Sequence, residues 1–141
     1  MEKIVSFFKS EPYSKEFTLG DFKVKLKTLS RIEFDDVMAR AGISLDNIVS
    51  KEAIVKRPIL GYAIISINGS PVSEVPEIKL AIEDYKKRYN QPSAPLNLMV
   101  EDALGNMDAG LVDILYDFYK TLQEENQKML LPRVCFWKQQ P

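Results

Sequence analysis

Side chains suited to catalysis or metal binding are scarce in this sequence of 141 residues. It contains no histidine, the commonest general base and metal ligand, and Cys135 is its single cysteine. A Ser-His-Asp or Cys-His mechanism is therefore excluded, and zinc would have to be held by carboxylates and one thiol. The glycine-rich phosphate-binding motifs and the G-x-S-x-G motif are also missing. We expect a protein that is not an enzyme, with no catalytic residues, no cofactor and no bound metal.

The densest group of carboxylates is formed by Glu33, Asp35 and Asp36. Such a cluster could be a set of metal ligands. However, these residues lie in the first turns of a predicted helix, where the helix dipole and the N-cap account for acidic side chains. The cluster therefore predicts a helix start rather than a metal site.

Two short basic segments could contact a phosphate backbone. Lys23, Lys25 and Lys27 alternate along a predicted strand, and the sequence KKRY begins at Lys86 near the end of a predicted helix. A solvated strand face and the helix dipole explain both segments. The net charge of −1 argues against a nucleic-acid or anionic-membrane partner. A small nucleic-acid-binding regulatory protein remains the alternative function.

The composition, 45% hydrophobic and 28% charged, is that of an ordinary folded domain. No apolar run is long enough for a membrane span, and a single cysteine fits a reducing cytoplasm. We divide the chain into an N-terminal arm at 1–15, a single domain at 16–132 and a C-terminal tail at 133–141. The apolar residues of the arm pack on the protein's own core or cover a neighbouring subunit. The aromatic pair of the tail, Phe136 and Trp137, is a lid on the core or an anchor for a partner.

The predicted fold class is mainly α (α+β), a small N-terminal β-hairpin followed by a bundle of about four to five helices. The hairpin covers 16–28 with a turn at Gly20-Asp21, and a Ser30–Glu33 capping box opens a helix that Gly42 closes. A helix capped by Ser50 is predicted to extend to 67 with an interruption at Pro58, although a buried strand over 59–67 competes with it. Two shorter helices are predicted at 76–89 and 95–104.

The longest periodic stretch is residues 107–131, which we predict to be one amphipathic helix. Asn106 is its expected N-cap, and Pro132 is expected to end it. A helix of this length in a small protein is the spine of the fold or a docking surface. Its apolar stripe contains Leu111, Leu115, Phe118, Leu122 and Met129, widened by Ile114 and Tyr119.

Three features follow one another in a defined order along the chain between Phe17 and Asn126. A polar L-S-x-x-E helix start follows a strand, a later apolar helix with small residues ends in a turn, and the last helix carries an aromatic stripe. The first feature is formed by Leu29, Ser30 and Glu33; the second by Leu60, Ala63, Ile64, Asn68 and Gly69; and the third by Leu115, Tyr116, Phe118, Tyr119 and Leu122.

This pattern resembles the tail assembly chaperones of tailed bacteriophages and the small baseplate-hub assembly proteins. The resemblance implies a non-enzymatic tail or baseplate assembly or structural protein, either a chaperone or a hub or tail-tip subunit. Its implied partners are other phage tail proteins (tape measure, hub or tube subunits) and copies of itself, with no small-molecule substrate and no membrane. Its implied location is the host cell cytoplasm during assembly, with retention in the virion tail left open. The predicted partner-binding residues are Leu115, Phe118, Tyr119, Leu122, Phe136 and Trp137.

Overall fold

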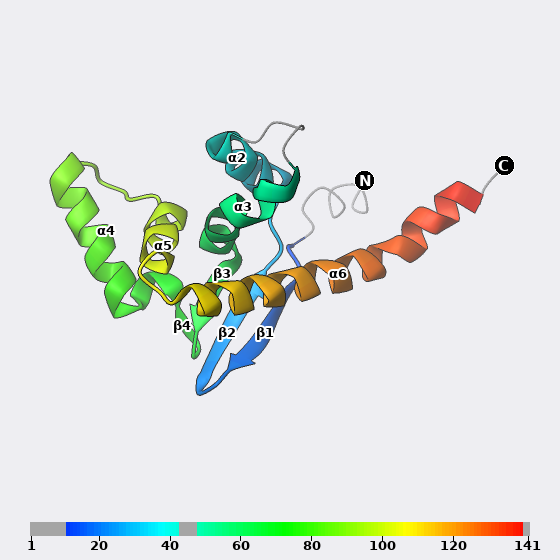
Figure 1. The fold of residues 1–141 in the computed structure, drawn as a ribbon, viewed down its shortest axis with the longest axis horizontal. Coiled ribbons are helices and arrows are strands. Elements are labelled where there is room, and N and C mark those ends of the chain that lie inside the picture. The colour runs from blue at the N-terminus through cyan, green and yellow to red at the C-terminus, as the bar shows by residue number, and fades with distance from the viewer. Residues whose placement is uncertain (1–10, 43–47, 140–141) are drawn as a thin grey trace, which may run out of the picture.

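The computed structural model describes the backbone of residues 11–42 and 48–139, and the side chains of 11–42 and 54–130. The fold is α+β and mainly helical, with a long C-terminal helix, as the sequence predicts (Figure 1). The elements are β1 (Ser14–Leu19), β2 (Phe22–Lys27), α2 (Arg31–Ala41), α3 (Ile48–Ala63), β3 (Ile64–Ile67), β4 (Ser70–Pro71), the 3-10 helix η1 (Val72–Glu74), α4 (Pro76–Tyr89), α5 (Leu96–Leu104) and α6 (Ala109–Gln139).

The predicted hairpin is confirmed, and it belongs to a larger sheet. Strands β1 and β2 are antiparallel and continue into a four-stranded sheet of order β1-β2-β3-β4. Gly20 adopts a φ of +60° in the hairpin turn, a conformation that glycine reaches without a steric cost. The side chains of β2 alternate as predicted, since Val24 and Leu26 are buried and Lys25 is exposed.

Helix α2 begins and ends where the sequence predicts. The Glu33 amide donates to Ser30 Oγ at 3.2 Å, and the Ser30 amide donates to Glu33 Oε1 at 2.9 Å, which completes a reciprocal capping box. Gly42, with a φ of 61°, closes the helix. Local side chain–backbone bonds therefore specify this element.

The apolar segment 59–67 is divided between helix and strand. Helix α3 passes through the buried Pro58 and ends at Ala63, after which Ile64–Ile67 forms β3 against β2. The two competing predictions are each right for part of the segment. The helix starts at Ile48, so the prediction of Ser50 as its N-cap is wrong, and residues 44–47 lie outside the described residues.

Helices α3 and α5 approach each other closely at Gly61. A Cβ atom added to this glycine would lie 2.5 Å from the carbonyl oxygen of Asn97. Because glycine has no Cβ, Gly61 permits this close packing of the two helices. Gly110 plays no such part, because the atom nearest to a Cβ there belongs to Asp108 in the cap of the same helix.

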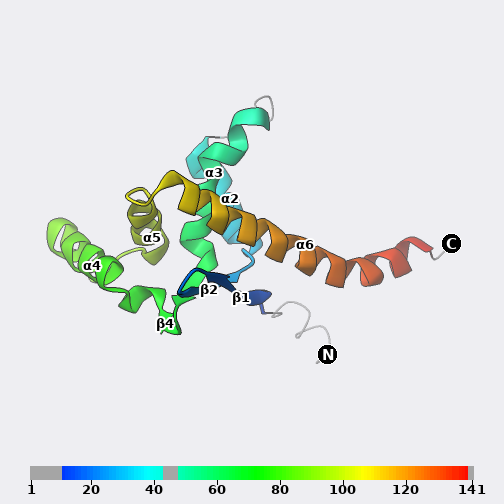
Figure 2. The same ribbon diagram turned by 60° about the horizontal axis from the view of Figure 1, so that its bottom comes forward.

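Helix α6 passes over the sheet and against α3, and it closes the core (Figures 1 and 2). Leu111 and Ile114, which the sequence places on the apolar stripe, are 38% and 40% exposed. The helical period is as predicted, but the buried face is rotated relative to the predicted stripe. The buried face of α6 consists of Val112, Leu115, Tyr116, Tyr119 and Leu122.

Both predicted ends of the long helix need correction. Asp108 rather than Asn106 is the N-cap, because its Oδ1 accepts a hydrogen bond of 2.8 Å from the Gly110 amide. Pro132 does not end the helix, which continues to Gln139. Proline has a φ compatible with a helix and removes one backbone donor, so the helix can continue at a cost of about 3 kcal/mol. The boundary predicted between 132 and 133 therefore lies within α6, and β1 begins inside the predicted arm at Ser14.

Candidate functional site

Most of the predicted partner-binding residues on α6 lie in the protein's own core. Leu115, Tyr119 and Leu122 are at most 3% exposed. Phe118 is half-buried and stacks on Phe17 of β1 with ring centroids 4.9 Å apart. In this conformation the first three residues hold α6 to the body of the protein and are not accessible to a partner. Phe136 and Trp137 belong to the helical backbone of α6, and their side chains lie outside the described residues.

The part of α6 after Glu125 extends away from the body. We call residues 126–139 the distal segment of α6. The last buried side chain on the described part of the helix is that of Leu122, and both ribbon views show the remainder extending beyond the other elements (Figures 1 and 2). Met129 is 61% exposed and Leu130 is 47% exposed. An apolar helix surface away from the core is a candidate docking surface.

Met129 belongs to the predicted apolar stripe but not to the predicted partner-binding residues, and Leu130 belongs to neither set. The available signal was the polar run of residues 123–128, which separates the apolar residues up to Leu122 from those that begin at Met129. That run interrupts the stripe at the point where α6 leaves the body.

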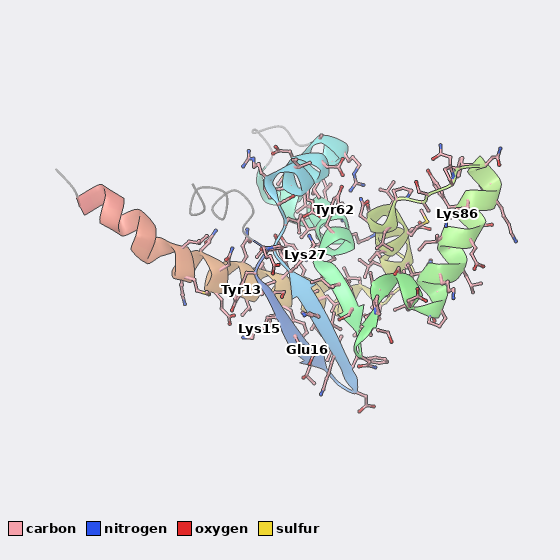
Figure 3. All side chains as sticks on the ribbon, turned by 180° about the vertical axis from the view of Figure 1, so that it is seen from behind. Tyr13, Lys15, Glu16, Lys27, Tyr62 and Lys86 are labelled. Carbon is pink, nitrogen blue, oxygen red and sulfur yellow. The ribbon has the colours of Figure 1, made fainter. Side chains whose placement is uncertain are left out.

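The start of the described chain is attached to α6 next to the distal segment. The Tyr13 hydroxyl donates to Glu125 Oε2 at 3.2 Å, and Lys15 Nζ donates to Glu125 Oε1 at 2.9 Å. The hydrogen bond from Lys15 lowers the pKa of the Glu125 carboxyl, and the same bond raises the pKa of Lys15. Figure 3 shows both side chains where β1 begins, beside α6. These contacts tie residues 13–15 to the boundary between the core part and the distal segment of α6.

The acidic residues of α2 are all engaged in ordinary structural interactions. Glu33 binds Lys27 and caps the helix, and Asp35 pairs with Arg31. Asp36 accepts hydrogen bonds from Tyr62 Oη at 2.5 Å and from Arg40 Nε at 3.0 Å. Among the described side chains of residues 11–42 and 54–130, no group of His, Cys, Asp and Glu is arranged to hold a metal ion.

The two basic segments do not form one continuous surface. Lys27 lies on β2 near the centre of the view and pairs with Glu33 at 2.7 Å, while Lys86 lies on α4 at the right (Figure 3). Arg88, two residues after Lys86 on α4, pairs with Asp84 at 3.3 Å. Among the side chains that the structure describes, these two segments therefore offer a phosphate backbone no single continuous basic surface.

A shallow hollow of about 240 Å³ lies between α3 and the start of α6. Its two cations already have partners, since Lys56 Nζ pairs with Asp113 at 2.9 Å and Arg57 Nε donates to the Glu101 carbonyl at 3.3 Å. The hollow therefore has no chemical feature that points to a ligand.

Two tyrosines predict how stability depends on pH at the alkaline end. The pKa values of Tyr62 and Tyr119 are both raised from 10.0 to about 12, and burial is the largest cause for each. For Tyr62, the hydrogen bond that its hydroxyl donates to Asp36 raises the pKa further. Above pH 10 the folded state therefore binds more protons than the unfolded state. We expect the free energy of unfolding to fall as the pH rises from 10.0 to about 12.

Urea unfolding at successive pH values measures this decline. The variant Tyr62→Phe should show a shallower decline, because one of the late-titrating phenols is gone. An equally steep decline in the variant would contradict the assignment to Tyr62.

No protein-family model matches this sequence, and comparisons with curated proteins and with solved structures find no significant similarity. Among the residues that the structure describes, no helix is both long enough and apolar enough to cross a membrane. The candidate site has to be interpreted from its own chemistry.

Proposed function

We propose that this protein works through protein–protein contacts, without catalysis of its own, and that the distal segment of α6 is its docking element. The observation that carries the proposal is the exposure of Met129 and Leu130, 61% and 47%, on a helix that has left the core. Contact with another protein would remove these two neighbouring apolar side chains from water.

The energetics of a projecting helix support this proposal. The distal segment has about 14 residues, and isolated helices of that length are marginal in water. Pro132 weakens it further, because it leaves one backbone carbonyl without an intrahelical donor. Contact with another surface would offset both effects, and an amphipathic helix in an apolar groove is a common mode of recognition.

The class of partner follows from the resemblance to phage tail assembly chaperones and baseplate-hub proteins. It suggests tape-measure, hub or tube subunits, or a second copy of this chain. Assembly in the host cytoplasm belongs to the same proposal.

The proposal predicts that a double variant, Met129→Gln with Leu130→Gln, loses its partner while the fold stays intact. Glutamine keeps a high helix propensity and removes the apolar surface. The measurement is co-purification of the full chain with tail proteins expressed from the same genome, identified by mass spectrometry. We expect the wild type to retain a tail protein and the double variant to lose most of it.

The matched control is Lys128→Gln, an exposed polar position on the same helix. It should retain the tail protein as the wild type does. Equal retention by the double variant, or retention of no tail protein by the wild type, would contradict the proposed docking element.

A further inference from the structure

The described part of the chain begins beside the base of the distal segment of α6. Through Tyr13 and Lys15, the start of β1 is bound to Glu125 at 3.2 Å and 2.9 Å. The Tyr13 backbone is fixed as well, because the Thr28 amide donates to its carbonyl oxygen at 2.8 Å. Residues 1–10 must therefore start from a point beside α6, about one helical turn before Met129.

The length of this segment suits the surface beyond it. Ten extended residues reach about 33 Å, whereas the distal segment rises about 21 Å along its axis. The segment could therefore follow the distal segment over its whole length without detaching Tyr13 from Glu125. Its attachment point also means that little loop has to be closed for such a contact.

The composition of residues 1–10 is complementary to the exposed surface. The segment contains Ile4, Val5, Phe7 and Phe8 among polar neighbours. Apolar side chains of this kind favour contact with apolar surface over exposure to water. The exposed apolar residues of the described structure that lie nearest along α6 to Glu125 on its distal side are Met129 and Leu130.

We infer that residues 1–10 bind along the distal segment of α6 in the same molecule and cover Met129 and Leu130. A partner that binds the same surface would compete with residues 1–10 for it. The inference rests on the surface named in the proposed function, but it requires no particular partner. A second copy of the chain and a tail protein are the competing occupants.

Paramagnetic relaxation measured by NMR tests this inference on the full chain. Cys135 is the single cysteine and lies in the distal segment, so a nitroxide attached there marks that segment alone. In isotope-enriched, spin-labelled protein, the amide signals of residues 2–10 should lose most of their intensity and regain it when the label is reduced. Signals of Gly20 and Asp21, at the far end of the hairpin, should be unaffected.

A mixed sample distinguishes binding of residues 1–10 within one molecule from binding to a second copy of the chain. It combines spin-labelled protein without isotopes and isotope-enriched Cys135→Ser protein, so that only contacts between molecules cause a loss of intensity. The signals of residues 2–10 should be unchanged in this sample. A loss of intensity here would assign the surface to a second copy, and no loss in either sample would mean that the segment binds elsewhere; each result overturns the inference.

Fluorescence provides a second measurement without a label, because Trp137 is the single tryptophan and lies in the distal segment. The variant Phe7→Ser with Phe8→Ser should shift the Trp137 emission to longer wavelength and increase its quenching by acrylamide. The matched variant Lys3→Ser with Lys9→Ser should leave both unchanged. These experiments use no partner, so the proposed function can fail while this inference holds, and the reverse.

Discussion

Replacing Leu122 by alanine is expected to lower the free energy of unfolding by about 3 kcal/mol. Its side chain is fully buried, at 0% exposure, and it is the last buried residue on the described part of α6. Truncation would remove apolar contacts and leave a cavity between α6 and the rest of the core. Urea unfolding followed by circular dichroism measures the loss.

Met129→Ala is the control on the same helix. Because Met129 is 61% exposed, its replacement should change the free energy of unfolding by no more than about 0.5 kcal/mol. The pair of variants separates residues that hold the fold from residues that are available to a partner. If the Leu122→Ala protein had unchanged stability, the core role of Leu122 would be contradicted, and the predicted role in partner binding would be favoured instead.

Replacing Gly61 by alanine is the second large effect that we expect. The new Cβ would lie 2.5 Å from the Asn97 carbonyl oxygen, and this atom belongs to the backbone of α5. The backbone cannot yield as a flexible side chain would, so α3 and α5 would have to separate. We expect the free energy of unfolding to fall by about 2–3 kcal/mol, although alanine is the better helix former.

Gly110→Ala provides the comparison, because it adds the same methyl group at a helical glycine. Its Cβ would lie 3.0 Å from Asp108 Oδ1, the end of a side chain that can move. The gain in helix propensity and the disturbed cap oppose each other, so the free energy of unfolding should change by less than about 1 kcal/mol. If thermal and urea unfolding showed equal losses for both glycines, the close approach of α3 and α5 would not be the cause.

Elements specified by local chemistry are those that the sequence predicts well. The capping box of Ser30 and Glu33, the closing Gly42 and the Gly20 turn depend on neighbours within a few residues. The alternation of Val24, Lys25 and Leu26 likewise shows which face of β2 is buried. Such signals can be read along the chain, because no distant segment is needed to complete them.

Elements decided by distant segments are those that the sequence leaves open. Residues 59–67 are mostly apolar, and only the pairing of Ile64–Ile67 with β2 separates strand from helix there. On α6, Leu111 and Val112 are equally apolar, and the position of the sheet and of α3 decides that Val112 is buried. Periodicity reports that a helix has an apolar face, but several faces of α6 satisfy it.

The candidate site shows the same limit. An aromatic pair at Phe136 and Trp137 drew attention to the end of the chain, whereas the surface described by the structure begins at Met129. The contact of Lys15 with Glu125 joins residues that are 110 positions apart. No local sequence pattern predicts such a pair, because lysine and glutamate are common on any protein surface.

The attachment of Tyr13 to Glu125 also affects how the protein should be handled. It places Tyr13 beside the base of the distal segment, so a bulky group attached close to Tyr13 or on the distal segment itself would lie near the proposed docking surface. Neither position therefore suits a fusion partner in a binding experiment. The exposed hairpin turn at Gly20 and Asp21 projects away from this region, and turns of this kind tolerate insertions well (Figure 1).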